Sequence, residues 1–338
     1  MIIVSNYPLA VTFTVLAMVC WGSWANTQKL IQSSWRFELF YWDMVTGLFL
    51  MSLIAAFTVG SLGTAGRPFL ADLLQADGKS ILSAMLGGVV WNLGNLLLVA
   101  AIAVAGMSIG FPIGGGIAWV LGIIVNYILV VMDKGHSDDN TLMLFTGVGV
   151  IVAAIFLSMI SYRRLASGQH KPTLKGILLS VSAGLLIAFF YGLVVNSLDN
   201  SFVTGGSGRL TPFTAIFFFS AGVFFSTLVF NPVFMRYPVQ GHQVTMHDYW
   251  KGSFNTHLIG VFGGSVWMLG MVLSFMAAGA AGPAISYALS NAAPVVAILW
   301  GIWVWKEFSA APPGTNRILI VMFVAYLIGL TLITYSKE

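Results

Sequence analysis

Amide and aromatic side chains inside long apolar segments are the residues of this sequence that could bind a polar solute. Asn92 and Asn95 lie three residues apart, and Tyr287 and Asn291 lie four apart, so each pair occupies one face of a helix. Amides donate and accept hydrogen bonds, and aromatic rings offer flat surfaces for stacking. Ionisable groups are nearly absent from these segments. The pattern therefore predicts a neutral polar solute rather than an amino acid or a phosphate ester.

The candidate solute contacts are amide and aromatic side chains placed within the apolar segments, mostly near their middle. They are Trp21, Trp24, Asn26, Trp91, Asn92, Asn95, Trp119, Tyr191, Asn196, Trp267, Tyr287 and Asn291. For each asparagine the alternative is a hydrogen bond that joins two helices. Polar side chains at membrane depth usually face the bundle interior or a solute path, and several of these lie on segments that recur along the chain. That recurrence favours a solute-binding role for the set.

Asp43 is the best candidate for proton coupling. It lies in the stretch FELFYWDMVTG, and if a helix begins near Phe37, a rise of 1.5 Å per residue places it about 9 Å inside. A carboxylate at that depth could take up and release a proton. The alternative is a carboxylate stabilised by the dipole at the helix N-terminus. His257, at the start of another segment, is a weaker candidate.

Motifs for other chemistry are missing from the sequence. It contains no H-E-x-x-H, no G-x-S-x-G and a single cysteine, Cys20, so we expect no metal, no cofactor and no enzymatic activity. The net charge of +4 does not indicate nucleic acid, because membrane proteins collect Lys and Arg in short loops. The expected partners are a small neutral polar solute, protons and the lipid bilayer, with the proton gradient as the driving force.

Ten long apolar runs must position these residues. Hydrophobic residues make up 58% of the chain and charged residues 8%, whereas soluble domains carry about 25% charged residues. Runs of this length and continuity predict membrane-spanning helices rather than barrel strands. The runs cover residues 9–30, 39–62, 81–104, 107–131, 142–161, 174–196, 212–235, 256–278, 282–304 and 317–335. In the fourth run, Pro112 and the glycines 114–116 predict a kink or loosening.

One phrase occurs twice in the chain. GGVVWNLG begins at Gly87 and GGSVWMLG begins at Gly263, a shift of 176 residues that superimposes Trp91 on Trp267. The chain therefore divides into residues 1–161, a short connector at 162–173, and residues 174–338, with five helices in each half. Because five is odd, the second half enters the membrane from the opposite face. Inverted repeats of this kind are a hallmark of secondary transporters.

The distribution of basic residues predicts the orientation. Ten of the fifteen Lys and Arg residues fall in the loops after the first, third, fifth, seventh and ninth helices. Cytoplasmic loops are the ones enriched in Lys and Arg. We therefore expect both termini outside and the connector 162–173 inside, in the inner membrane of a bacterium, with the protein a monomer or a homodimer.

Three stretches of the first half resemble the ureide permease family, a branch of the drug/metabolite transporter superfamily near the bacterial glucose/ribose porters. They are YWDM around Asp43, the segment from Phe57 to Phe111, and LGIIVNYILVVMD from Leu121 to Asp133. The second half is similar in layout more than in letters. Plant members carry a long central cytosolic loop with a nucleotide-binding-like motif, and the short connector here departs from that pattern.

The resemblance implies a fold and an activity. The fold is an all-α integral membrane protein of two inverted five-helix repeats, the drug/metabolite transporter fold. The activity is proton-coupled import of a ureide or nucleobase of the allantoin, uracil or xanthine type. It also places Asp43, Asn92, Asn95 and Asn126 within matching motifs. A sugar or nucleoside porter of the glucose, ribose or rhamnose type remains the alternative, because amides and aromatic rings suit both kinds of solute. A passive channel on the same layout is distinguished only by accumulation against a gradient.

Overall fold

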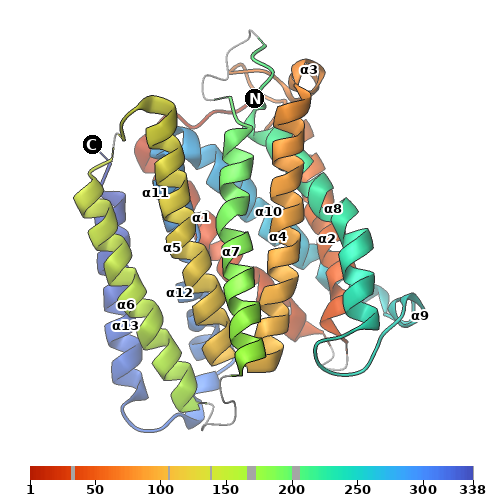
Figure 1. Cartoon of the computed structure of the whole chain (residues 1–338), viewed down its shortest axis with the longest axis vertical. Coiled ribbons are helices and arrows are strands. Elements are labelled where there is room, and N and C mark those ends of the chain that lie inside the picture. Colours follow the sequence, from red (N-terminus) through yellow and green to blue (C-terminus); the bar gives the residue numbers. More distant parts are fainter. Residues whose placement is uncertain (32–34, 106, 138, 166–172, 200–205, 338) are drawn as a thin grey trace.

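Within the residues that it describes, the computed structural model has ten helices long and apolar enough to cross a membrane, which confirms the predicted all-α membrane fold. The structure describes residues 1–31, 35–105, 107–137, 139–165, 173–199 and 206–337. Most of the predicted connector, residues 166–172, lies outside the described part. The helices form one bundle, with both termini and α3 at one end and α9 at the other (Figure 1). These ends are called the terminal end and the α9 end below.

The ten spans are built from the following elements. The first half contains α1 (Tyr7–Ser23) with the 3-10 turn η1 (Trp24–Leu30), α2 (Phe37–Phe57), α3 (Phe69–Gln75), α4 (Gly78–Ala105), α5 (Met107–Lys134) and α6 (Thr141–Leu165). The second half contains α7 (Leu174–Asn196), α8 (Pro212–Arg236), α9 (Met246–Tyr249), α10 (Phe254–Ala281), α11 (Pro283–Ser290), α12 (Pro294–Leu299), η2 (Trp300–Val304), η3 (Glu307–Ala310) and α13 (Thr315–Thr334).

The helices of the two halves pack in corresponding pairs. α4 packs against α7 and α8, and its counterpart α10 packs against α1 and α2. In the two halves α7 corresponds to α1 and α8 to α2. The contact of α4 with α7 therefore corresponds to that of α10 with α1, and the contact of α4 with α8 to that of α10 with α2. The last spans of the halves, α6 and α13, lie side by side at one edge (Figure 1). The packing and the two termini at one end are consistent with two inverted repeats.

The second glycine in each copy of the doubled phrase brings two helices into backbone contact. A Cβ atom on Gly88 of α4 would lie 2.0 Å from the carbonyl oxygen of Phe219 in α8. One on Gly264 of α10 would lie 1.8 Å from the carbonyl oxygen of Met44 in α2. Any side chain would overlap the neighbouring backbone at either place. The phrase is therefore repeated at the same kind of close crossing in each half.

Replacing Gly264 with alanine is expected to destabilise the protein. The added methyl group would force α10 away from α2, and overpacking of this kind costs about 1–3 kcal/mol, occasionally more. Thermal unfolding in detergent, followed by tryptophan fluorescence, should show a lower melting temperature. Gly149→Ala is the matched control, because a Cβ there meets nothing within 4 Å. Equal melting temperatures for the two variants would contradict the close contact.

A buried cluster of charges ties the two halves together at the terminal end. The Arg67 guanidinium, only 5% exposed, donates to Asp72 at 2.8 Å and lies 2.9 Å from Asp199. The other carboxylate oxygen of Asp72 accepts a hydrogen bond from the Thr211 N–H at 2.7 Å. Asp72 belongs to α3 in the first half, whereas Asp199 and Thr211 belong to the second half, so the cluster links the region of α3 to the segment before α8.

The elements differ from the predicted runs in three places. The short helices α3 and α9 are too brief to show as apolar runs. The fourth run forms a continuous helix, α5, so the glycines 114–116 do not interrupt it. The ninth run, predicted as one helix over 282–304, is instead divided between α11 and α12.

Candidate functional site

The interruption of the ninth span releases backbone groups in the middle of the bundle. Pro294 has no N–H and its ring crowds the carbonyl four residues earlier, so a regular helix cannot continue through it. The Ala292 N–H bonds to Leu289 instead of Ala288. The freed Ala288 carbonyl accepts a hydrogen bond from the Trp119 indole N–H of α5 at 3.0 Å. The sequence predicted a kink or loosening on the fourth span, and the structure has its break on the counterpart, the ninth span.

A second bond between the same two spans lies beside the first. The Tyr287 hydroxyl donates to the Ala118 carbonyl of α5 at 2.9 Å. Gly122 leaves room for this ring, since a Cβ there would lie 2.3 Å from it. The fourth and ninth spans therefore hold each other through reciprocal bonds from side chain to backbone.

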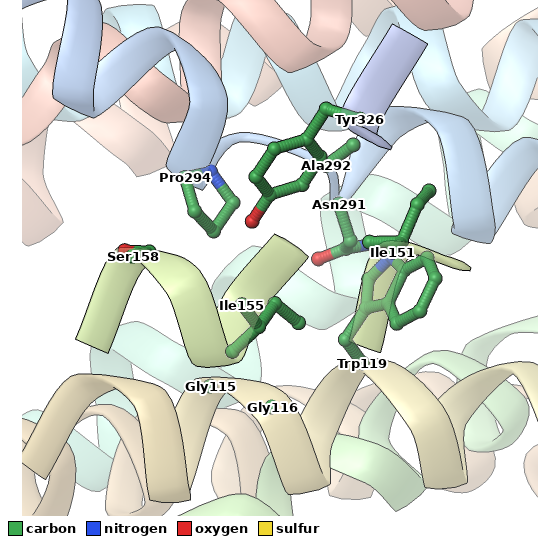
Figure 2. Close-up of a pocket in the computed structure, with 10 residues that line it drawn as sticks. All are labelled: Gly115, Gly116, Trp119, Ile151, Ile155, Ser158, Asn291, Ala292, Pro294 and Tyr326. Atoms are coloured by element: carbon green, nitrogen blue, oxygen red, sulfur yellow. The ribbon is translucent and has the colours of Figure 1, made fainter. Parts of the chain in front are cut away.

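A small pocket lies next to these bonds. Its walls come from α5, α6, the break between α11 and α12, and α13 (Figure 2). These are two pairs of corresponding spans, the fourth with the ninth and the fifth with the tenth. The pocket therefore lies at the interface of the two halves, near the middle of the spans, where secondary transporters place their solutes. Gly115 and Gly116 contribute space by their lack of side chains.

Three side chains give the pocket its chemistry. The Tyr326 hydroxyl points into it (Figure 2), although the residue is only 1% exposed and the hydroxyl has no hydrogen-bond partner among the described residues. The Asn291 amide donates its N–H to the Tyr287 carbonyl at 3.1 Å, and its oxygen points into the pocket. The Trp119 N–H is already bonded to the Ala288 carbonyl, and its ring lines the pocket. A buried hydroxyl without a protein partner is a group that a solute can bond.

The doubled tryptophans meet at the centre of the bundle and are not among the residues that line this pocket. The ring centroids of Trp91 and Trp267 lie 4.2 Å apart, and Trp21 stacks on Trp267 at 5.8 Å. The Trp21 N–H donates to the Trp267 carbonyl at 3.0 Å. Tyr191 packs in the same aromatic core, 4.9 Å from Tyr287. These rings are buried core in the structure, and α4, α10 and α1 converge on them.

The asparagines of α4 join helices. Asn92 is fully buried, accepts a hydrogen bond from the Tyr41 hydroxyl at 2.6 Å, and donates to Ser226 at 2.7 Å and Thr227 at 3.0 Å. Asn95 makes a longer contact of 3.4 Å to the same tyrosine oxygen. The helix-joining alternative therefore describes the contacts of Asn92, which connect α4 to α2 and α8.

The remaining candidates lie apart from the pocket. Trp24 and Asn26 belong to η1, and the Asn26 oxygen accepts a hydrogen bond from the Trp305 indole at 2.6 Å. Asn196 ends α7 and is exposed. Asn126, placed by the resemblance, is buried on α5 with its amide N–H on the Gly122 carbonyl at 2.7 Å. Of the predicted set, the structure thus brings Trp119 and Asn291 to the pocket, with Tyr287 bonded beside them.

Sequence reasoning missed Tyr326 and Ser158 as pocket residues. Tyr326 lies within the apolar run VMFVAYLIG, and a tyrosine in the middle of a span was the available signal. It belongs to no repeated phrase and has no polar neighbour in the sequence, so nothing linked it to the other candidates.

Asp43 forms a second, separate site near the α9 end. Asp43 is buried, and its carboxylate lies 2.9 Å from the His257 Nδ1 of α10 and accepts a hydrogen bond from the Tyr249 hydroxyl of α9 at 2.6 Å. Burial and the neighbouring carboxylate raise the pKa of Tyr249, so the phenol stays a donor at neutral pH. In the described residues no three His, Cys, Asp or Glu side chains gather as metal ligands.

Known proteins match this chain over nearly its full length. A family model described as Ureide permease matches residues 40–170 and 159–336. Ureide permease 1 of Arabidopsis thaliana is 24% identical over 97% of both chains, and Ureide permease 4 of the same plant is 25% identical over 100% of this chain and 99% of its own. A protein of known crystal structure, 15% identical, covers 98% of this chain with a TM-score of 0.58, which shows a shared fold.

Proposed function

The chain belongs to the ureide permease family, and from that premise we propose that it is a proton-coupled secondary transporter that imports a small neutral ureide or nucleobase by alternating access. The names of its relatives describe permeases of ureides, which are transporters rather than enzymes. They give no support to the sugar or nucleoside alternative. That alternative therefore enters the test below only as a comparison.

The pocket at the interface of the two halves carries the proposal. A ureide or oxo-pyrimidine ring is flat and presents carbonyl oxygens and N–H groups at its edge. The Tyr326 hydroxyl would donate to a carbonyl, the Asn291 oxygen would accept from an N–H, and the Trp119 ring would cover one face of the solute. The ten residues that line the pocket include no charged side chain. This favours a neutral solute over an ionised one.

Alternating access is supported by the corresponding packing of the halves. If one half adopts the arrangement of the other and the reverse, the contacts α4 with α8 and α10 with α2 exchange, and the opening moves to the other face. The break at Asn291 and Pro294 gives the ninth span two segments. Rotation of one segment against the other would open or close the pocket.

Coupling is assigned to Asp43, and α10 connects it to the pocket. His257, near the start of α10, contacts Asp43, and Ser274 of the same helix accepts a hydrogen bond at its carbonyl from the Ser286 hydroxyl of α11 at 2.6 Å. Seventeen residues separate His257 from Ser274, so one rigid helix spans about 26 Å between the two sites. A shift of α10 on proton binding would move the segment that carries Tyr287.

Uptake into proteoliposomes under an inward proton gradient tests the function. The panel consists of labelled allantoin, uracil, xanthine, glucose, ribose and a nucleoside, each with and without an uncoupler. We expect accumulation of one or more heterocycles that the uncoupler removes. Accumulation of a sugar alone would reject the solute class, and equilibration without accumulation would indicate a passive pathway.

The membrane and the orientation are a further part of the proposal. The protein is an integral membrane protein, but the relatives named above come from a plant and give no support for the bacterial inner membrane expected from the sequence. For the orientation, we propose that the terminal end faces outward and the α9 end faces the cytoplasm. A cysteine placed at exposed His247 should then react with a membrane-impermeant maleimide only after the cells are permeabilised.

A further inference from the structure

The buried carboxylate of Asp43 is not isolated, because two side chains from other helices bond to it. Asp43 already accepts from the Tyr249 hydroxyl at 2.6 Å, and its two oxygens lie 3.0 and 2.9 Å from His257 Nδ1. Both donors form hydrogen bonds of the kind that favours the ionised form of a carboxylate. The imidazole is the neighbouring group that can gain a proton while keeping the bond to Asp43.

The second ring nitrogen of His257 has a route to solvent that Asp43 lacks. The His257 side chain is 22% exposed, whereas that of Asp43 is 4% exposed. Nε2 faces the turn after α9, where a Cβ on Gly252 would lie 2.5 Å from it. A proton can therefore reach Nε2 from the α9 end without breaking the Nδ1–H···Asp43 bond. Trp35 packs edge-on against the imidazole ring, with ring centroids 5.7 Å apart.

We propose that His257 carries the coupling proton on Nε2, with Asp43 as its fixed counter-ion and Tyr249 as the second donor that keeps the carboxylate in place. This rests on the proposed function and names the group in it that is protonated. The neutral imidazole donates through Nδ1–H, and protonation of Nε2 gives an imidazolium beside a carboxylate. The pair then has no net charge. A buried pair is far less costly than one uncompensated buried charge, so the protonated pair is the form that can move with α10.

Other ionisable groups near the α9 end are occupied or turned away. Ion pairs join Arg36 with Glu38, Lys29 with Glu307, and Lys251 with Asp248. His247 of α9 and Arg236 of α8 are exposed. No contact of any of these groups with Asp43 is present in the described part of the chain. The charge of this site is therefore set by Asp43, His257 and Tyr249.

The carboxylate that caps α9 does not titrate in the range of transport. Hydrogen bonds from Thr245 and Lys251 lower the pKa of Asp248 from 3.8 to about 2. A depressed value means that the cap is fully present above about pH 4 and is lost only as the pH falls towards 2. A change in transport near neutral pH therefore cannot arise from this cap.

Solute counterflow and proton movement, measured on the same vesicles, test the proposal. The variant is His257→Gln, which keeps an amide in place of the ring, and the matched control is His247→Gln on exposed α9. A trapped pH-sensitive dye reports protons that enter when allantoin or uracil is added outside. We expect His257→Gln to lose proton entry and accumulation while counterflow without a gradient persists, and His247→Gln to behave like the wild type.

The outcomes separate this proposal from the proposed function. Proton entry that persists in His257→Gln would overturn the role of His257. Wild-type counterflow without proton entry would overturn the proton site and leave transport standing, whereas absence of wild-type counterflow for every solute would overturn the function. Nitrogen-15 NMR of histidine-labelled protein in nanodiscs needs no solute. We expect neutral His257 to carry its proton on Nδ1, and a proton on Nε2 instead would reject the arrangement.

Discussion

Replacement of Asp43 by asparagine is expected to abolish accumulation of solute on a proton gradient, while exchange of solute across the membrane continues. Asparagine keeps the size of the side chain and an oxygen for Tyr249 and His257, but removes the negative charge that balances a protonated imidazole. Without that charge a protonated imidazole would be an uncompensated buried charge, so the site should no longer bind a proton. The solute pocket is formed by other helices, so the variant should still bind solute.

The size of the expected loss follows from the gradient. One pH unit across the membrane can support about tenfold accumulation of a neutral solute carried with one proton. The wild type should approach that ratio and Asp43→Asn should stay at equal concentrations on both sides. Asp77→Asn is the control, because Asp77 is an exposed carboxylate that caps α4 through the Ser80 N–H, and asparagine caps equally well. A variant that still concentrates solute would remove Asp43 from the coupling mechanism.

Replacement of Tyr326 by phenylalanine is expected to weaken solute binding without weakening the fold. The hydroxyl is buried, points into the pocket and has no partner among the described residues. Loss of one buried hydrogen bond to the solute corresponds to about 1–2 kcal/mol, or about five- to thirtyfold in affinity. The solute-free protein loses no bond and sheds an unpaired polar atom, so its melting temperature should stay equal or rise.

Tyr41→Phe provides the opposite case. The Tyr41 hydroxyl donates to Asn92 between α2 and α4 and lies outside the pocket. Its removal should lower the melting temperature and leave solute affinity nearly unchanged. Binding by scintillation proximity and thermal unfolding, measured on both variants, give the comparison. Full affinity in Tyr326→Phe would place the solute elsewhere in the bundle.

The residues predicted to contact the solute fall into two groups in the structure, one at the pocket and one in the aromatic core. Trp119 and Asn291 meet at the interface of corresponding spans, whereas Trp91 and Trp267 stack in the core where α4 and α10 cross. The doubled phrase therefore lies where these helices cross. In the structure its glycines permit the close approach of backbones, and its tryptophans fill the space between them.

The apolar runs were sufficient to predict the ten spans that the described residues form. The reason is local: each span must satisfy its own backbone hydrogen bonds in lipid, so its length and composition appear within one continuous segment. The break in the ninth span was not predicted, although Pro294 is a residue type that interrupts helices. An apolar run shows where a span begins and ends but not whether its helix continues through a proline.

The grouping of side chains was decided only by the tertiary structure. Whether an asparagine faces a cavity or a neighbouring helix depends on the rotation of its helix, and that rotation is set by glycine contacts such as Gly264 with Met44, more than 200 residues apart. Tyr326 joins Trp119 because α13 packs on α6 beside α5. Asp43 meets His257 and Tyr249 because Gly260 lets α10 approach α2, where a Cβ would lie 2.5 Å from Asp43. Composition determines that polar groups enter the membrane, whereas packing between distant segments determines which of them meet.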